Sequence, residues 1–393
     1  MSTPQQSQAP HRGLATYRQL APSASVRVSN LCLGAMTFGL AHQERYGEMT
    51  KEIAFAIMDH YYDNGGNFID TANVYHEGQS EQWLGEWMAK RKIRDQIVLA
   101  TKYTNASSSG SKDPNEVRAN YVGTGTKSMR LSLERSLANL QTSYIDLFYV
   151  HYWDYTTSIP ELMHALNDLV SSGKVNYLGI SDAPVWVVTK ANQYARDHGL
   201  RQFVVYQGMW NAAMRDFERD IIPMALDEGM GLCPYGVLNQ GRFQTAEGYK
   251  EREKHNPGRN FIPLSERDKQ VSAKLEALSK KTGHSLFNIA LAYVLHKSPY
   301  VFPIIGARVV DHLEKNISAL DVRLSEEDMA EIESAYDFDH GFPHTFLSGT
   351  LFDGSKPRGV TGARDVMFNN MGNPRFEWMD TPKSISLRWT RFY

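Results

Sequence analysis

The sequence has little cysteine and no long hydrophobic run. Cys32 and Cys233 are its two cysteines among 393 residues. They are too few for a disulfide framework or a zinc pattern, and they suit a reducing compartment. No stretch approaches the roughly 18 apolar residues that a membrane helix needs. Residues 1–12 are polar and contain no apolar signal-peptide segment. We therefore expect a cytoplasmic protein without membrane contact.

An excess of charge of one sign is also missing. The chain has 42 Lys and Arg against 44 Asp and Glu, a net charge of −2. A protein that binds nucleic acid or an anionic membrane through its overall field needs a basic surplus, so neither is an expected partner. The 42% hydrophobic and 22% charged residues are ordinary for a globular protein with a large core.

What the sequence does contain is a regular alternation of two kinds of segment. Short apolar runs typical of strands buried on both faces alternate with amphipathic stretches at helical spacing. The expected strands are residues 31–34, 67–70, 96–102, 144–151, 175–180, 203–207, 231–234 and 301–306. Eight βα units predict a (β/α)₈ TIM barrel. The alternative is a doubly wound open sheet, which the missing GxGxxG after the first strand disfavours.

The barrel is expected to carry an addition at each end. We expect residues 1–16 to be disordered, residues 17–336 to form the barrel, and a hairpin within 17–29 to cap its bottom. Ser80 and Ser325 stand where helices are expected to begin. Residues 337–393 form a C-terminal extension rich in aromatics and glycine. Long segments of this kind are usually functional or disordered, and we expect either a substrate lid or an extension that is disordered or packed on the surface.

Polar side chains stand at the ends of the expected strands. Asp70, Lys102 and His151 end the second, third and fourth strands, and Tyr75 lies on the loop after the second. The carboxyl ends of barrel strands form the active-site face, so these four side chains are expected to converge there.

This set of side chains suits proton transfer to a carbonyl oxygen. An ammonium favours the phenolate of a neighbouring tyrosine, a carboxylate holds the ammonium in place, and a histidine can orient the carbonyl. Each residue alone has a structural explanation: Asp70 as a turn cap, Tyr75 as a packed aromatic, Lys102 with its head in solvent, and His151 as a core histidine. Their joint position at strand ends favours catalysis. The set lacks a hydride source, so a cofactor must supply one.

At this point the sequence resembles the aldo-keto reductase family. The resemblance covers about residues 18–333 and rests on FIDTANVY at 68–75, ATK at 100–102, YIDL at 144–147 with His151, GIS at 179–181 and PIIGAR at 303–308. It implies an NADP-dependent barrel with the catalytic tetrad Asp70, Tyr75, Lys102 and His151. Within the family the chain is similar to fungal aryl-alcohol dehydrogenases and norsolorinic acid reductase-like enzymes, through YVHYWD at 149–154, GISDAP at 179–184 and PYGVL at 234–238.

The same resemblance implies a set of residues for NADP(H). Asp70 borders the cofactor in such a barrel. At the nicotinamide, the resemblance places Ser181, Asp182 and Gln207 beside the carboxamide and Tyr235 beside the ring. It places Gly236 and Arg242 at the pyrophosphate, and Gly306, Arg308, His312 and Asn316 at the adenosine. Many family members have Asn where Asp182 stands, and many place the stacking aromatic where Pro234 stands. Arg308 can hold a 2′-phosphate through a forked contact.

Three functions are open at this stage. The leading one is NADP-dependent reduction of an aldehyde or ketone, aromatic or polyketide-derived and so part of secondary metabolism, or the reverse oxidation of an aryl alcohol. The second is a non-catalytic reductase-like barrel that binds NADP as a scaffold or redox-sensing subunit, which would not need the tetrad. The third is a metal-dependent hydrolase, disfavoured because no His-x-His pair lies on an early strand. No metal is expected, and the partner is a small aromatic carbonyl or alcohol.

Overall fold

We describe a computed structural model of the chain, in which residues 13–106, 113, 115–255, 262–347 and 351 are described. The strands are β1 (Tyr17–Ala21), β2 (Ala24–Ser29), β3 (Cys32–Gly34), β4 (Phe68–Asp70), β5 (Val98–Tyr103), β6 (Ile145–Val150), β7 (Val175–Ser181), β8 (Phe203–Met209), β9 (Gly231–Tyr235) and β10 (Ile304–Ile305). Within these residues no helix is both long and apolar enough to cross a bilayer.

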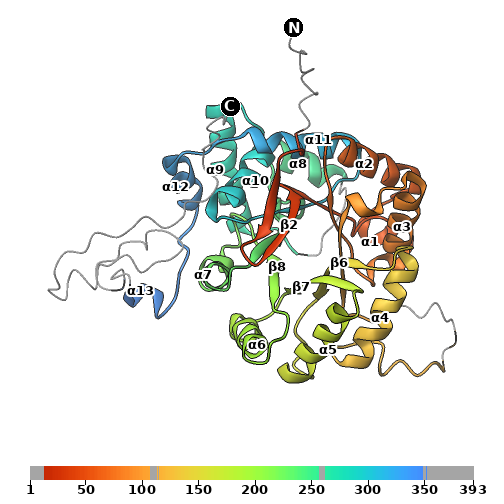
Figure 1. Cartoon of the computed structure of the whole chain (residues 1–393). Helices are drawn as coiled ribbons and strands as arrows, with labels where there is room; N and C mark the ends of the chain where they lie inside the picture. The colour runs from red at the N-terminus through yellow and green to blue at the C-terminus, as the bar shows by residue number, and fades with distance from the viewer. Residues whose placement is uncertain (1–12, 107–112, 114, 256–261, 348–350, 352–393) are drawn as a thin grey trace, which may run out of the picture.

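The helices alternate with the strands and surround them (Figure 1). They are α1 (Gln43–Tyr46), α2 (Lys51–Asp63), α3 (Gln79–Arg91), α4 (Thr126–Asn139), α5 (Ile159–Ser171), α6 (Val185–Asp197), α7 (Ile221–Asp227), α8 (Ala246–His255), α9 (Glu266–Thr282), α10 (Leu286–Lys297), α11 (Val310–Ile317), α12 (Glu326–Glu333) and α13 (His344–Leu347), with the short 3₁₀ turns η1 (Tyr75–Gly78), η2 (Arg94–Gln96), η3 (Asp216–Glu218), η4 (Asn239–Gly241) and η5 (Ser318–Asp321).

Eight of the strands form one parallel sheet that curves into a barrel. Their order is β10-β3-β4-β5-β6-β7-β8-β9, with parallel pairing between neighbours. A parallel bridge between Leu232 and Val301 joins β9 to the segment before β10 and brings the two edges of the sheet together. The predicted (β/α)₈ architecture is confirmed, and the open-sheet alternative is wrong.

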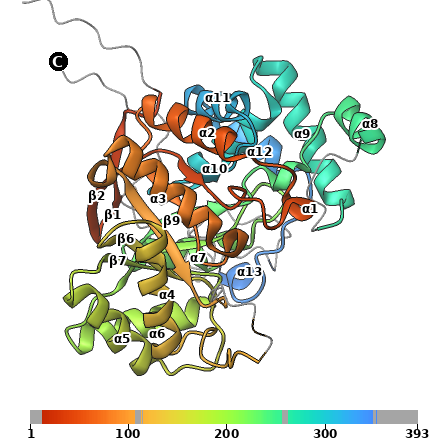
Figure 2. The same ribbon diagram turned by 90° about the vertical axis from the view of Figure 1, so that its right-hand side faces the viewer.

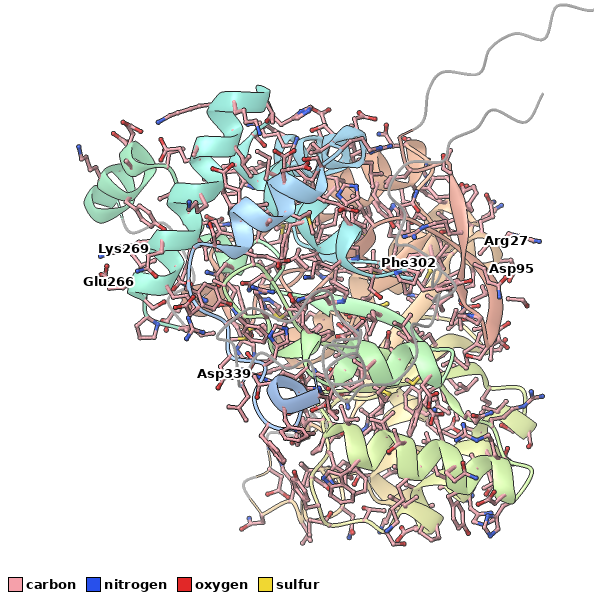
Figure 3. All side chains as sticks on the ribbon, turned by 90° about the vertical axis from the view of Figure 1, so that its left-hand side faces the viewer. Arg27, Asp95, Glu266, Lys269, Phe302 and Asp339 are labelled. Carbon is pink, nitrogen blue, oxygen red and sulfur yellow. The ribbon has the colours of Figure 1, made fainter. Side chains whose placement is uncertain are left out.

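The N-terminal hairpin closes one end of the barrel, as predicted. Strands β1 and β2 pair antiparallel, and Leu20, Ala21 and Val28 pack with barrel residues that include Phe302 in one apolar cluster. Arg18 lies 4.5 Å from the Phe302 ring and donates to the carbonyl of Val301 at 2.6 Å. Figure 2 shows the hairpin at one edge of the molecule, and Figure 3 labels Phe302 beside it. The hairpin therefore covers the amino-terminal end of the barrel, opposite the strand ends that carry Asp70 and Lys102.

The start of one helix differs from the expectation. Ser325 caps α12, as predicted, and it also forms a capping box with Asp328. Ser80 does not cap α3, because the helix begins at Gln79 after Gly78, which has a φ of 92°. The Ser80 hydroxyl is therefore available for a contact other than a helix cap.

The first part of the C-terminal extension packs beside the connection that follows β8. Arg219 donates to the carbonyl of Asp339 at 2.9 Å, His344 lies 3.2 Å from Asp220, and Arg215 and Arg219 cover the Phe338 ring. Asp339, labelled in Figure 3, lies just before α13. Residues 352–393, which hold most of the predicted lid, and residues 1–12, predicted to be disordered, lie outside the described residues. The domain boundaries and the lid stay predictions.

Candidate active site

Asp70 and Lys102 form a buried ion pair at the carboxyl ends of β4 and β5. The Lys102 ammonium lies 2.5 Å from Asp70 Oδ1 and also donates to the carbonyl of Thr71 at 2.7 Å. Gln207, near the end of β8, donates to Asp70 Oδ2 at 3.0 Å. Lys102 has no exposed surface. A charge in such a place must be paired, and Asp70 supplies the partner.

Tyr75 stands over this pair on the turn after β4. The Lys102 ammonium donates to the Tyr75 hydroxyl oxygen at 3.4 Å and lies 5.1 Å from the ring centre. In the part of the chain that the structure describes, the phenol has no acceptor for its own proton. Because the oxygen accepts from Lys102, that proton is free to point toward a ligand.

Burial and neighbouring charges have opposite effects on the pKa values of Tyr75 and Lys102. Burial raises the pKa of Tyr75 above its ordinary value, and the Lys102 charge opposes that rise. Burial alone would favour the neutral amine, but Asp70 and Tyr75 outweigh it and raise the pKa of Lys102. We expected the ammonium to lower the tyrosine pKa. The ammonium does pull in that direction, but desolvation is the larger effect. At neutral pH the site therefore holds a protonated phenol beside a charged ammonium.

His151 directly follows β6 and faces Tyr75. The two ring centres are 5.9 Å apart with the rings nearly perpendicular. Burial, with a smaller effect from the Lys102 charge, lowers the pKa of His151 to about 3. The amide nitrogen of Asn105 lies 3.0 Å from Nδ1. Since that amide donates, Nδ1 accepts, and the proton of the neutral imidazole is on Nε2.

The residues predicted for the nicotinamide gather beside Asp70. Ser181 ends β7, and Asp182 follows it with a φ of 43°, a left-handed conformation that Asp tolerates better than most residues. The Tyr235 hydroxyl, at the end of β9, lies 3.2 Å from both Asp182 carboxylate oxygens, and the Ser181 hydroxyl lies 3.4 Å from one of them. Burial raises the pKa of Asp182 to about 6.

Two residues predicted for the pyrophosphate lie in the loop after β9. Gly236 has a φ of 66°, which favours glycine, and its carbonyl accepts from Asn211 at 3.0 Å. Arg242 is buried, lies 3.3 Å from Asp268 and donates to the Asn239 side chain. Its guanidinium is thus already held by neighbours, and a role as charge partner of the pyrophosphate stays a prediction.

The residues predicted for the adenosine surround the start of α11. Asn316 is buried and lies 3.4 Å from the carbonyl of Gly306, where a Cβ would meet open space. Arg308 is exposed and lies against Gly47, where a Cβ would come within 2.3 Å of its guanidinium. Within the described residues, Arg308 pairs with no carboxylate, and no side chain caps α11. His312, also exposed, is near enough for the Arg308 charge to help lower its pKa after burial.

Some residues of the site carry no recognisable sequence signal. Asn105 sets the tautomer of His151, yet it follows β5 as a single polar residue among others. Thr71 acts through its backbone carbonyl, which no side-chain pattern reveals. Tyr149 lies with its ring 5.9 Å from the Lys102 ammonium, and Gly179 makes room for it, since a Cβ there would come within 2.4 Å of the ring. In the sequence, nothing distinguishes Tyr149 from the other residues of its largely apolar strand.

The described residues hold no group of three or more His, Cys, Asp or Glu arranged to bind a metal. The family model for the aldo/keto reductases matches residues 30–337. The chain is 63% identical to norsolorinic acid reductase B of Aspergillus parasiticus over 95% of this chain and 97% of that protein. It is 62% identical to norsolorinic acid reductase B of Dothistroma septosporum, over 94% and 93%.

It is also 46% identical to an aryl-alcohol dehydrogenase [NADP(+)] of Phanerodontia chrysosporium, over 85% of this chain and 89% of that protein. The family match covers most of the barrel, including the strand ends described above. The resemblance seen in the motifs is confirmed, and the metal-dependent hydrolase is wrong. The protein is an enzyme that belongs to the aldo/keto reductase family.

Proposed function

We propose that this enzyme uses NADPH to reduce an aromatic, polyketide-derived aldehyde or ketone to the alcohol, or catalyses the reverse oxidation of an aryl alcohol. The observation that carries the proposal is the direction of one hydrogen bond. The Tyr75 oxygen accepts from Lys102, so the phenol proton is left for a substrate oxygen. A scaffold that only binds NADP would not need this arrangement.

In this proposal Tyr75 is the proton donor. NADPH, when bound, supplies a hydride to the carbonyl carbon. Tyr75 gives its phenol proton to the carbonyl oxygen, and the Lys102 ammonium stabilises the phenolate that remains. Asp70 keeps that ammonium charged and in place. The Nε2 proton of His151 can donate to the same carbonyl oxygen and orient it.

The residues at the other end of the site fit a nicotinamide dinucleotide phosphate. Ser181, Asp182 and Gln207 offer donors and acceptors beside Asp70 for the carboxamide. Arg308, exposed and without a carboxylate partner in the described residues, offers a fork of donors to a 2′-phosphate at the uncapped start of α11. The name of the Phanerodontia relative, which includes NADP(+), supports the same cofactor.

Aromatic side chains near Tyr75 support an aromatic substrate. The rings of Tyr46 and His76 are 5.2 Å apart, and those of His151 and Tyr152 are 6.3 Å apart. Tyr46 is near enough to Tyr75 to contribute to the rise in its pKa, after burial and the larger effects of Lys102 and Asp70. His76 is completely buried, but Tyr46, His151 and Tyr152 are partly exposed, and offset or edge-on packing with such rings stabilises a flat aromatic ligand. The names of the relatives, norsolorinic acid reductase and aryl-alcohol dehydrogenase, point to the same class.

A substrate panel tests this function. The purified enzyme is mixed with NADPH and, in turn, an aromatic aldehyde, an aryl ketone of polyketide type and an aliphatic aldehyde, and the nicotinamide absorbance is followed with product identification by mass spectrometry. We expect alcohol products and a higher kcat/KM for the aromatic substrates. NADPH binding without turnover on any carbonyl or alcohol would instead support the non-catalytic scaffold.

A further inference from the structure

The first turn of α3 lies behind the ends of β4 and β5, outside the barrel. Ser80 and Glu81 in this turn have no exposed surface. The Ser80 hydroxyl donates to the carbonyl of Ala35 at 2.8 Å and lies 2.8 Å from the Thr71 hydroxyl. Because Ser80 donates its proton to Ala35, the Thr71 hydroxyl is the donor in the second bond. Ser80 thus ties the residue after Asp70 to the start of the helix.

Thr71 connects this contact directly to the catalytic ammonium. Its side chain bonds to Ser80, while its carbonyl accepts from Lys102 at 2.7 Å. A shift of Thr71 therefore moves one of the acceptors that fix the ammonium. The neighbouring Asp70, whose carboxylate is a second acceptor for the Lys102 ammonium, would move together with Thr71.

Glu81 makes the matching contact to the next strand. Its Oε1 accepts from the Thr101 hydroxyl at 2.7 Å, and its Oε2 accepts from the Asn139 amide at 3.1 Å. Successive strand residues point to opposite faces. Thr101 therefore points outward to Glu81, while Lys102 points into the barrel. Glu81 thus fixes the backbone immediately beside the lysine.

Two features suggest that these contacts serve more than stability. Within the described residues Glu81 pairs with no cation, although burying a carboxyl group without a counter-ion is costly. The loop that Thr71 and Ser80 close contains Tyr75, followed by His76 and Glu77 with φ values of 49° and 58°. Such left-handed conformations persist in ordinary residues only where the surroundings hold them. The contacts to α3 supply that restraint.

We infer that Ser80 and Glu81 are positioning residues for the proposed reduction, and that they hold Thr71 and Thr101 so that the Lys102 ammonium stays between Asp70 and the Tyr75 hydroxyl. The inference rests on the proposed function, because it assigns a purpose to the tetrad geometry. Neither residue touches the reacting atoms. They act through the two strand ends.

A pair of substitutions at Thr101 separates positioning from stability. Thr101→Val keeps the shape of the side chain and suits a strand, but it removes the hydroxyl bond to Glu81. Thr101→Ser keeps the hydroxyl but loses a methyl group. Since a misplacement of about 1 Å can cost on the order of 10²-fold in rate, we expect kcat of Thr101→Val to fall about 10- to 100-fold. Thr101→Ser should restore most of that loss, even if its Tm is the lower of the two.

Further readouts distinguish this role from a general loss of structure. NADPH affinity, measured by fluorescence titration, should change less than about twofold in Thr101→Val, because its proposed contacts lie elsewhere. The alkaline limb of the kcat–pH profile should move to higher pH, because a displaced ammonium lowers the tyrosine pKa less. Ser80→Ala and Glu81→Gln should change kcat in the same direction. Ser128→Ala, which removes a buried hydroxyl that has no partner in the described residues, should leave kcat and its pH profile unchanged.

Tyr75→Phe, assayed in parallel, distinguishes a failure of the proposed function from a failure of the positioning role alone. If Tyr75→Phe retains wild-type turnover, the proposed function itself fails. If Tyr75→Phe is inactive while Thr101→Val and Ser80→Ala are folded with wild-type kcat and pH profile, the positioning role of Ser80 and Glu81 is overturned alone. Losses that follow Tm across all variants, including Thr101→Ser, would also overturn it in favour of a purely structural role.

Discussion

Two clusters inside this protein combine a lysine, a tyrosine and at least one carboxylate. One is the site at the strand ends, with Asp70, Lys102 and Tyr75. The other lies among η3, α10 and α12 and consists of Arg215, Glu218, Tyr293, Lys297 and Glu333. Lys102, Tyr293 and Glu218 are almost completely buried. Residue type and burial alone therefore do not distinguish the proposed reactive site from a structural cluster.

The direction of the tyrosine hydrogen bond does distinguish them. The Tyr293 hydroxyl donates to Glu218 at 3.1 Å, so its proton already has an acceptor within the cluster. Lys297 lies 3.0 Å from Glu218 and 2.6 Å from Glu333, so both carboxylates have a cation partner. The Tyr75 oxygen instead accepts from Lys102 and keeps its own proton. The side chains of the second cluster satisfy one another, whereas in the first the phenol proton of Tyr75 has no acceptor within the described residues.

The largest expected contrast comes from removing the lysine of each cluster. Lys102→Met should lower kcat by about 10²-fold or more and move the alkaline limb of its pH profile upward, because the charge that opposes the rise in the Tyr75 pKa is gone. Lys297→Met should leave kcat near the wild-type value but lower the free energy of unfolding by about 3 kcal/mol, because it breaks buried ion pairs. Steady-state kinetics and urea unfolding measure the two effects. Equal losses of activity in both variants would remove the distinction between the clusters.

Acid should weaken the Arg215–Glu333 cluster in a defined pH range. Burial favours a protonated Glu218, but Lys297 and Arg215 outweigh burial and lower its pKa from an ordinary 4.5 to about 2. A carboxylate with a lowered folded-state pKa contributes stability that is complete above its unfolded pKa and is lost as the pH falls through the folded one. That contribution is on the order of 3 kcal/mol.

The matched variant is Glu218→Gln, which cannot ionise. The difference in unfolding free energy between wild type and variant should be largest above pH 4.5 and should shrink as the pH falls toward 2. Comparing the two proteins at each pH cancels the titration of other groups. A difference that does not vary with pH would mean that the charge of Glu218 contributes nothing to stability.

The sequence predicted the fold more completely than it predicted the side-chain contacts around the site. Apolar strand runs and helical spacing located the barrel, and motifs pointed to four residues that the structure brings together at the strand ends. Ser80 was expected to cap a helix, but it bonds to Thr71 and Ala35 from inside α3. Such contacts depend on the register of neighbouring strands, which no local pattern contains. The Arg215–Glu333 cluster was missed for the same reason, because it is assembled from three segments that are far apart in the chain.

Two arginines show the same difference between a side chain with a protein partner and one that is left for a ligand, here the cofactor. Arg215 makes a two-pronged contact with Glu218, whereas Arg308 has no carboxylate partner within the described residues. Arg308→Ala should therefore lower NADPH affinity about ten- to a hundredfold, the value of a charged hydrogen bond of roughly 1.5–3 kcal/mol. NADH affinity should change little. Fluorescence titration with both cofactors measures this, and an equal loss for both would indicate a structural role for Arg308.

The smallest effect concerns the two carboxylates of the site itself. Asp70 accepts from a cation, whereas Asp182 accepts from hydroxyls and has a pKa raised by burial to about 6. Protonated Asp182 offers a donor and an acceptor to a carboxamide, as Asn would, but the ionised form offers acceptors only. NADPH affinity should therefore weaken a few-fold as the pH rises through 6. Asp182→Asn should flatten this dependence, and a variant that keeps it would assign the titration to another group.

The most direct test of the contrast replaces each tyrosine by phenylalanine. Single-turnover reduction of an aromatic aldehyde is measured at saturating NADPH in wild type, Tyr75→Phe and Tyr293→Phe, with cofactor binding checked in each protein. Tyr75→Phe should bind NADPH normally and lose about 10²–10⁴-fold in rate, the usual cost of a missing positioned acid. Tyr293→Phe should keep the wild-type rate and lose only stability. A Tyr75→Phe variant with a near wild-type rate would contradict the account.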